Sequence, residues 1–375
     1  MIIILLQIQP TKNRFTTMKR LTILAITLLT FSFLPKEAKA CDSCNFFEYS
    51  LLQNRSYFGL FYRHRSFGDY TQYGNTTNQV TTAGLSNAVF ENSAANNYTP
   101  NARTLSATIP DQRVMHEPEG TGLYVNKTKM DWETYETVEL RGNFMLKNNW
   151  NFAFLLPYES NVVYYEKLLD LPNLVQDTTI SVKGWGDLTL AADYIHYIYN
   201  PKARHTFRPG IAITAPTGQS RQIANAEQLY DPIIQPGTGS WSLIGRMNYQ
   251  LFYTKTGANL SFSYKTATEG SQDYQFGNSF NGSAVGFHQF TINNDWILVP
   301  NLGGYFEHAA NDTWEGEKQA LTGGDVVFAQ AGTDLNIKDW TLSFVWQTPL
   351  SQSLNGNQIL HKNRLSIGVI KSFKL

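Results

Sequence analysis

The sequence predicts an all-β protein that forms a closed antiparallel transmembrane β-barrel of about twelve strands. Three observations predict it: apolar and polar residues alternate with period two, the alternating segments are long, and short and long connections take turns between them. Segments of about 10–14 residues exceed the usual strand of about 5–6 residues and are long enough to cross a bilayer at a tilt. The alternative is a soluble β-sandwich, which prefers shorter strands.

Composition agrees with a surface that partly faces lipid. Charged residues make up 16% of the chain and aromatic residues 14%, whereas soluble domains carry about 25% charge. Mean hydropathy is nevertheless −0.30, which excludes a helical membrane protein. A barrel combines both properties, because only every second strand residue faces lipid.

Residues 1–40 are predicted to be a signal peptide, with Met18 as the true start. Lys19 and Arg20 precede an apolar run that ends at Leu34, and Ala38-Lys39-Ala40 forms a small-x-small cleavage site. This segment holds more basic than acidic residues, so the mature chain has a net charge of about −5. An acidic balance argues against a nucleic-acid partner.

The strands are expected at regular places along residues 55–375. In the last one, Leu365, Ile367 and Val369 alternate with Ser366 and Gly368. The twelve expected strands lie near residues 55–66, 132–146, 150–165, 185–199, 205–216, 241–254, 258–268, 284–292, 296–309, 324–336, 340–349 and 362–373.

The connections follow the pattern of outer-membrane barrels, which have short periplasmic turns and long outer loops. Tight turns are expected at 147–149, 200–202, 255–257, 293–295 and 337–339. Longer loops are expected near 67–131, 166–184, 217–240, 269–283, 310–323 and 350–361. An even number of strands places both termini in the periplasm. The 67–131 segment is too long for an ordinary loop, so it either forms a partial plug in the lumen or hangs outside.

Charged residues on the strands are expected to face the lumen, because a charge facing lipid at mid-depth costs about 2–4 kcal/mol. The alternation assigns Glu139, Arg141, Asp193, Arg246 and Lys265 to the inner face. They either line a polar channel, pair with one another and close it, or contact a ligand directly.

The mature N-terminal segment, residues 41–54, carries a Cys-x-x-Cys motif at Cys41 and Cys44. In the oxidising periplasm the two cysteines form a disulfide, or they hold copper or zinc, or Cys41 is lipidated. Further metal ligands would come from His64, Met115 or His116. No other cofactor is expected.

No catalytic motif is present, so the sequence predicts a protein that is not an enzyme. The histidines form no His-Glu-x-x-His array, and Gly-x-Ser-x-Gly and phosphate-loop motifs are missing from the sequence. A barrel hydrolase that uses His196, His288 or His308 is kept as an alternative.

Three stretches resemble a known family: Gly184-Trp185-Gly186-Asp187-Leu188, Thr214-Ala215-Pro216-Thr217-Gly218 and Pro236-Gly237-Thr238-Gly239-Ser240. Their order and spacing are similar to the outer-membrane family named for the meta-pathway of phenol degradation, over about residues 184–245. The resemblance implies a barrel transporter, related in style to fatty-acid and aromatic-hydrocarbon channels. The residues of this rim motif either stabilise the outer rim or contact substrate: Gly186, Asp187, Pro216, Thr217, Gly218, Gly237 and Gly239.

Together these features predict an outer-membrane channel or passive transporter for small solutes, with apolar or aromatic solutes as one option. Its partners would be outer-membrane lipid, the small-molecule solute and the barrel-assembly machinery. The main alternative is a plugged barrel with a structural or metal-handling role that uses the Cys pair.

Overall fold

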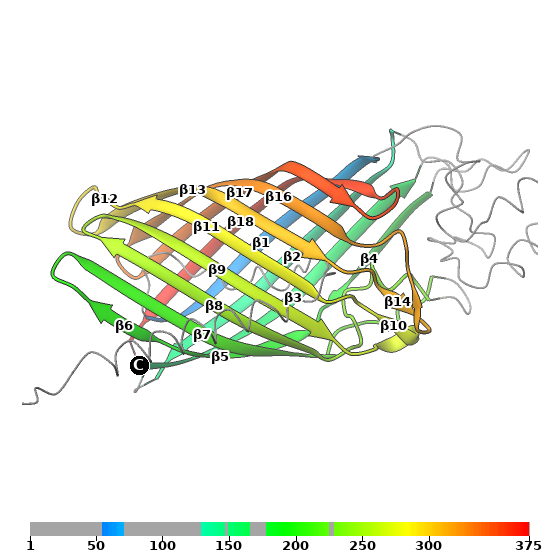
Figure 1. Ribbon diagram of the computed structural model, residues 1–375, viewed down its shortest axis with the longest axis horizontal. Coiled ribbons are helices and arrows are strands. Elements are labelled where there is room, and N and C mark those ends of the chain that lie inside the picture. The colour runs from blue at the N-terminus through cyan, green and yellow to red at the C-terminus, as the bar shows by residue number, and fades with distance from the viewer. Residues whose placement is uncertain (1–54, 71–128, 147–148, 166–177, 225–228, 375) are drawn as a thin grey trace, which may run out of the picture. The chain divides into compact units, whose positions relative to one another are not determined.

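The structure is a computed structural model that describes residues 55–70, 129–146, 149–165, 178–224 and 229–374. Within these ranges the chain is mostly β-strand, and the strands slant side by side around a single wall (Figure 1). In the part of the chain described, no helix has the length and apolar character needed to span a membrane.

The described residues form twelve antiparallel barrel strands, as the sequence predicts. Two of them are interrupted. One consists of β4 (Thr178–Trp185), β5 (Leu188–Tyr194) and β6 (His196–Tyr199), and the other of β11 (Ser279–His288) and β12 (Phe290–Thr291). The ten continuous strands are β1 (Ser56–Tyr70), β2 (Trp132–Met145), β3 (Trp150–Tyr165), β7 (Ala203–Ala215), β8 (Ser242–Tyr253), β9 (Thr256–Ala267), β13 (Trp296–Ala309), β16 (Gly324–Ile337), β17 (Trp340–Leu354) and β18 (Ile359–Phe373).

The first and last strands close the barrel. Each barrel strand pairs with its neighbours in the chain, and β18 returns to pair with β1, from Ser56 opposite Phe373 to Tyr70 opposite Ile359. The two strands run together as blue and red ribbons in Figure 1. Closure pairs the backbone groups of every wall strand and removes the sheet edges, which a bilayer demands.

Short turns gather at one end of the barrel and longer connections at the other. At the short-turn end, Asn149, Thr254 and Lys338 adopt positive φ. The longer connections include a small sheet of β10 (Tyr274–Gln275), β14 (Thr313–Trp314) and β15 (Glu317–Lys318), next to the 3-10 turn η5 (Ser271–Asp273).

Three expected loops are shorter than predicted, because the strands continue past the apolar belt. β17 and β18 extend so far that only residues 355–358 connect them, with Gly356 at φ +63°. The prediction of a long loop over 350–361 was therefore wrong. β4 begins at Thr178 and β11 at Ser279, inside the expected 166–184 and 269–283 loops. These extensions are polar, so alternating hydropathy alone does not mark them as strand.

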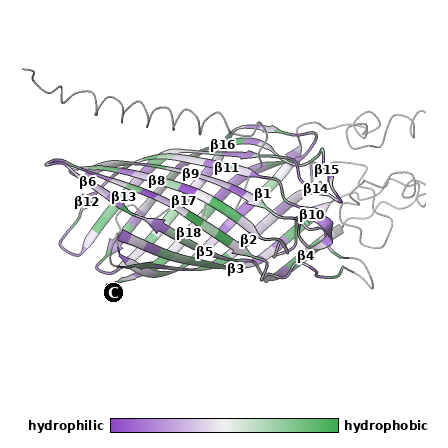
Figure 2. Ribbon diagram, turned by 60° about the horizontal axis from the view of Figure 1, so that its bottom comes forward, coloured by the Kyte–Doolittle hydropathy of each residue, from purple (hydrophilic) through white to green (hydrophobic). Residues whose placement is uncertain are grey.

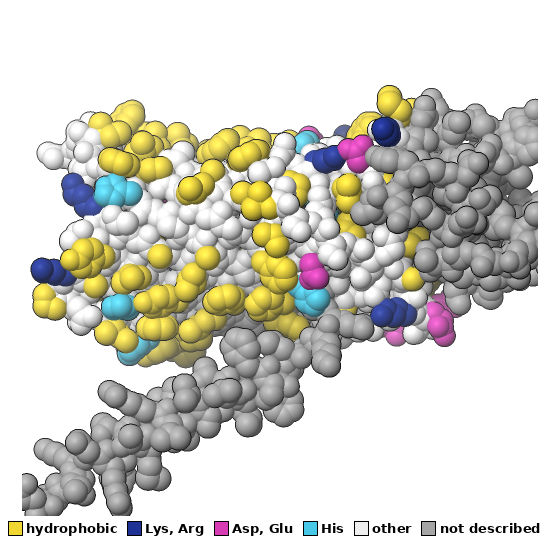
Figure 3. All heavy atoms as spheres, turned by 45° about the horizontal axis from the view of Figure 1, so that its top comes forward, with side chains coloured by type: hydrophobic (Ala, Val, Ile, Leu, Met, Phe, Trp, Pro, Cys, Tyr) yellow, Lys and Arg dark blue, Asp and Glu magenta, His cyan; other side chains and the backbone are white. Residues whose placement is uncertain are grey.

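The two faces of the wall differ in chemistry. Hydropathy alternates along each ribbon (Figure 2). The outer face presents large apolar side chains such as Phe58, Leu140, Leu243 and Phe344. In the space-filling view they spread over the wall, with charged and histidine side chains towards its two ends (Figure 3). Trp150, Trp296 and Trp340 begin strands after short turns and are exposed, as in an interfacial aromatic girdle.

Candidate functional site

The inner face of the described strands carries charges of both signs. Side chains that alternate with the exposed apolar residues point inward, and eight basic and six acidic residues do so. They are Arg63, Arg65, Arg141, Arg204, Arg208, Arg246, Lys265 and Arg364, with Glu133, Glu139, Glu159, Asp193, Glu307 and Asp334. The interior is therefore polar and slightly richer in positive charge.

Glu139 on β2 holds two arginines. Its carboxylate pairs with Arg63 of β1 and accepts a 2.8 Å hydrogen bond from Nε of Arg141, two residues further along its own strand. The Arg141 guanidinium lies 4.0 Å from the ring centroid of Phe61. Glu139 has no exposed surface. A buried carboxylate needs such partners, because desolvating a charge alone is costly.

Asp193 on β5 and Arg246 on β8 form a second ion pair across the intervening strand β7. Nε of Arg246 donates to the Asp193 carboxylate at 2.6 Å, and Asn151 donates to it at 3.0 Å. Gly210 of β7 is the register partner of both charged residues. Because glycine has no side chain, the two groups meet over its backbone: a Cβ there would lie 2.9 Å from Cγ of Asp193.

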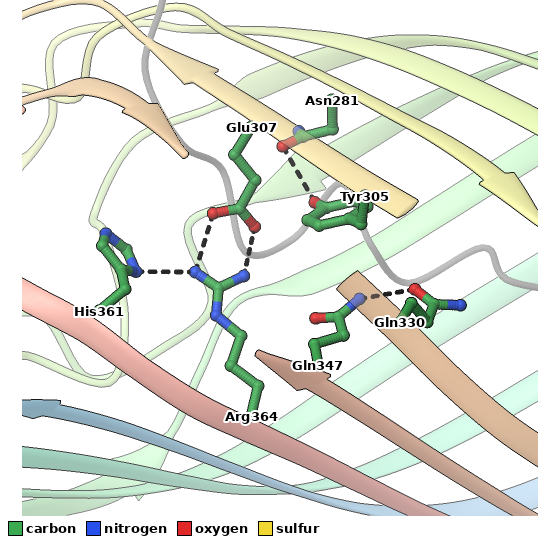
Figure 4. A network of polar contacts seen from close by, with 7 residues as sticks. All are labelled: Asn281, Tyr305, Glu307, Gln330, Gln347, His361 and Arg364. Carbon is green, nitrogen blue, oxygen red and sulfur yellow. Dashed lines mark hydrogen bonds and ion pairs between the residues drawn. The ribbon is translucent and has the colours of Figure 1, made fainter. Parts of the chain in front are cut away.

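A third pair crosses two strands. Arg364 on β18 donates two hydrogen bonds to Glu307 on β13, at 2.5 and 2.8 Å, although β16 and β17 lie between them. Figure 4 shows the guanidinium facing the carboxylate, with the His361 ring beside it. Nη2 of Arg364, which also contacts Glu307, lies 2.9 Å from Nδ1 of His361. On the two intervening strands, Gln347 of β17 donates a 2.7 Å hydrogen bond to Gln330 of β16.

An aromatic cluster lies near the long-connection end of the lumen. Tyr135, Val163, Tyr165, Ile180 and Val182 form it together with Ile234, which comes from the connection between β7 and β8. Asn161 of β3 donates a 2.9 Å hydrogen bond to the Ile234 carbonyl. The connection thus folds inward onto the barrel wall, which the sequence analysis missed. The expected long loop or partial plug spans residues 67–131, and its residues 71–128 lie outside those described.

The rim motif converges on Asp187, at the break between β4 and β5. Its carboxylate accepts hydrogen bonds from the Gly218 amide at 2.8 Å and from the Thr238 amide and hydroxyl at 2.8 and 2.6 Å. Thr217 adds a hydroxyl contact to the Leu188 amide. Pro216 lies directly after the end of β7. The three stretches, far apart in sequence, are thereby joined at one point of the rim.

The glycines of the rim motif allow this close approach. A Cβ on Gly218 would lie 2.8 Å from Cα of Gly237, and one on Gly186 would lie 2.9 Å from the Pro236 carbonyl oxygen. Gly239 has φ +66°, where a side chain is strained. These contacts give the motif a structural role, which is to hold three chain segments together at the rim. A contact of its residues with substrate stays a prediction.

The structure places all five predicted lumen residues on the inner face, and it pairs four of them: Glu139 with Arg141 and Asp193 with Arg246. Lys265 also points inward, on β9. Sequence reasoning missed Arg63, Arg65, Glu307 and Arg364. Their signal was the same alternation: Glu307 follows outward-facing Phe306, and Arg364 precedes outward-facing Leu365.

The metal candidates are only partly described. His64 lies on the outward face of β1, opposite Glu136 of β2, with 3.7 Å between Nδ1 and a carboxylate oxygen. Cys41, Cys44, Met115 and His116 lie outside the described residues. Within those ranges, no group of three or more His, Cys, Asp and Glu residues is arranged to hold a metal ion. Copper or zinc binding by the Cys pair stays a prediction.

The histidines considered for a hydrolase lie on the outward face. His308 pairs with Asp325 of β16, and the His288 ring lies 2.7 Å from the Thr256 hydroxyl. His196 is exposed on β6. Among the residues that the structure describes, no serine hydroxyl is hydrogen-bonded to any of these rings.

Comparisons with known proteins place the fold. No protein-family model matches the chain, and no curated protein matches its sequence. Among solved structures, an outer-membrane channel from Pseudomonas putida F1 is similar over 91% of this chain and 99% of its own, with a TM-score of 0.53 and 15% identity. A Bordetella autotransporter β-domain matches with a TM-score of 0.41 and 10% identity, over 86% of this chain and 100% of its own.

The first likeness shows a shared fold, and nothing is argued from the second. The closed twelve-stranded wall, with its apolar outer face and polar interior, defines the class of this molecule: it has the β-barrel fold of bacterial outer-membrane proteins.

Proposed function

We propose that this chain is an outer-membrane channel for small polar solutes. One observation carries the proposal: charged and amide side chains line the interior of strands whose outer faces are apolar. Polar groups cost free energy when they are buried without partners, so a barrel that served only as an anchor would be simplest with an apolar filling. The short-turn end then faces the periplasm, and residues 1–40 direct export.

The solute class follows from the same interior. The motif resemblance to the phenol-pathway family supports a transporter, and that resemblance left apolar or aromatic solutes open. The arginine and glutamate side chains at mid-barrel favour polar solutes instead, because an apolar solute would desolvate them without offering hydrogen bonds. Apolar contacts are available mainly at the cluster around Tyr135 and Ile234.

A plugged structural barrel is the second candidate. Two observations favour it: Ile234 folds into the lumen, and the Arg364–Glu307 pair reaches over two strands on the inner face. The side chains of Ile234, Glu307 and Arg364 are all buried. The two candidates make opposite predictions for solute permeation, so one experiment separates them.

Liposome swelling tests the channel. Liposomes that contain the purified, folded protein should swell in isotonic alanine or arabinose faster than liposomes without protein, because the solute enters through the lumen. The matched control is protein that has been heated until it no longer migrates on a gel as the folded barrel does. This unfolded protein should give no swelling. Equal rates for folded protein, heated protein and empty liposomes would reject the channel and favour the plugged barrel.

A further inference from the structure

We infer that Arg65 and Arg364 form a carboxylate-binding site inside the barrel, and that Glu307 is its built-in competitor. The inference rests on the proposed channel and deepens it, because it names small carboxylates as the solute class. Three features carry it: the placement of two arginines, the geometry of the fork that Arg364 presents, and the origin of the carboxylate that fills that fork.

The two arginines are direct neighbours. Arg65 of β1 and Arg364 of β18 are register partners, and both side chains point inward. Like charges directly opposite each other on neighbouring strands repel. The Arg65 guanidinium lies 5.0 Å from the ring centroid of Tyr135, and its charge interacts most strongly with Glu159 and then with Arg364. Two buried arginines on neighbouring strands raise the local positive potential, which favours an anion between them and the lumen.

The Arg364 fork is held in one orientation before any solute arrives. Its guanidinium lies 4.1 Å from the ring centroid of Phe328, and Nη2 contacts Nδ1 of His361 at 2.9 Å. The His361 ring in turn lies 4.7 Å from the ring of Phe67, centroid to centroid. A planar fork fixed in this way matches the two oxygens of a carboxylate.

Glu307 reaches this fork from β13, across the span of β16 and β17, and binds it at two points. Its two oxygens therefore mark where the oxygens of a solute carboxylate would lie. Because the side chain is tethered, it competes at an effective concentration on the order of millimolar or more. A solute must displace it, which keeps binding weak and release fast, as conduction requires.

Current block by benzoate tests the inference, with benzamide as the neutral control. In single-channel recordings in potassium chloride, benzoate should block Glu307→Gln at an about tenfold lower concentration than wild type, since the tethered competitor is gone. Benzamide should block neither protein. Glu136→Gln removes a carboxyl on the outward face of the wall, one that accepts a hydrogen bond from Tyr62; it frees no arginine fork and should leave the benzoate block unchanged.

The double variant Glu307→Gln/Arg364→Lys keeps the positive charge but loses the guanidinium fork. It should therefore lose the increased sensitivity to benzoate that Glu307→Gln shows. Three results would each overturn the site: equal benzoate block of wild type and Glu307→Gln, an equally increased sensitivity to benzoate in Glu136→Gln, or an increased sensitivity that persists in the double variant. If Glu307→Gln does not assemble, Arg364→Lys alone decides: the site requires weaker benzoate block with chloride conductance retained, and unchanged block rejects it.

The site and the channel can fail separately. A protein that conducts but shows none of these shifts is a channel without this site. If no conductance is seen, calorimetric titration of the purified barrel with benzoate still decides the site. About tenfold tighter binding to Glu307→Gln would then support it although the channel had failed, and equal binding would reject both.

Discussion

Arg364 of β18 and Glu307 of β13 form a two-point ion pair across the barrel interior, although two further strands separate them along the wall. Both side chains are more than nine-tenths buried. The pair therefore bridges two wall strands that are three positions apart in the ring of twelve. Breaking it from one side leaves a buried charge without its partner, so the pair bears on both stability and permeation.

Arg364→Met should lower the free energy of unfolding by about 3–5 kcal/mol, the usual cost of removing one partner of a buried pair. The double variant Arg364→Met/Glu307→Gln should recover most of this loss, because the second change also removes the stranded carboxylate. Urea unfolding of the barrel in lipid vesicles measures both. A single variant as stable as wild type would show that the pair is not formed.

Gly210→Ala should destabilise the barrel by about 1–3 kcal/mol, the range for overpacking at a tight contact. Its Cβ would press on Asp193 and on the Ala192 carbonyl, at 2.9 Å from each of Cγ and O. Gly245→Ala on β8 is the matched control, since a Cβ there meets nothing within 4 Å. The same unfolding experiment should separate the two variants, and equal effects would remove the role assigned to Gly210.

Asp187→Asn should loosen the outer rim, because one carboxylate that accepts three hydrogen bonds is replaced by an amide. Hydrogen bonds to a charged group contribute about 1.5–3 kcal/mol each. Hydrogen exchange of the Gly218 and Thr238 amides should become faster. Asp295→Asn, at an exposed ion pair with Lys338, is the control. Unchanged exchange in Asp187→Asn would mean that the joint is held by other contacts.

The fold was predictable because lipid imposes one rule on every strand. Apolar residues at alternate positions, as in Leu365, Ile367 and Val369, are sufficient to locate strands, and the twelve strands and their closure are confirmed. The strand ends beyond the membrane obey no such rule. β17 continues through polar residues to Leu354, where alternation carries no information.

The candidate site was predictable in part for the same reason. Alternation assigns a face to each charge, so the inward direction of Glu139 and Arg246 followed from sequence. The partners did not, because Arg364 meets Glu307 across two strands and Asp193 meets Arg246 over Gly210. These contacts depend on the curvature of the closed wall. The connection that carries Ile234 likewise folds inward with a hydrogen bond from Asn161. No local sequence pattern predicts this contact.

Orientation can be tested by labelling intact cells with an impermeant maleimide. Single cysteines are placed in a Cys41→Ser/Cys44→Ser background, which should assemble normally. A cysteine at Asp273, in a long connection, should be labelled, and one at Lys338, in a short turn, should not. Lysed cells supply the control, since both sites should then react. The reverse pattern in intact cells would invert the assigned topology.

The channel proposal predicts current through a planar bilayer. Purified protein should insert in discrete steps of conductance, and Glu307→Ser/Arg364→Ser should give larger steps than wild type, because two long side chains that project into the lumen are shortened. Heat-denatured protein controls for leaks. Single-channel recording of these two proteins is the most direct measurement of the central claim: larger, stable steps for the variant support it, and no steps for either folded protein would contradict it.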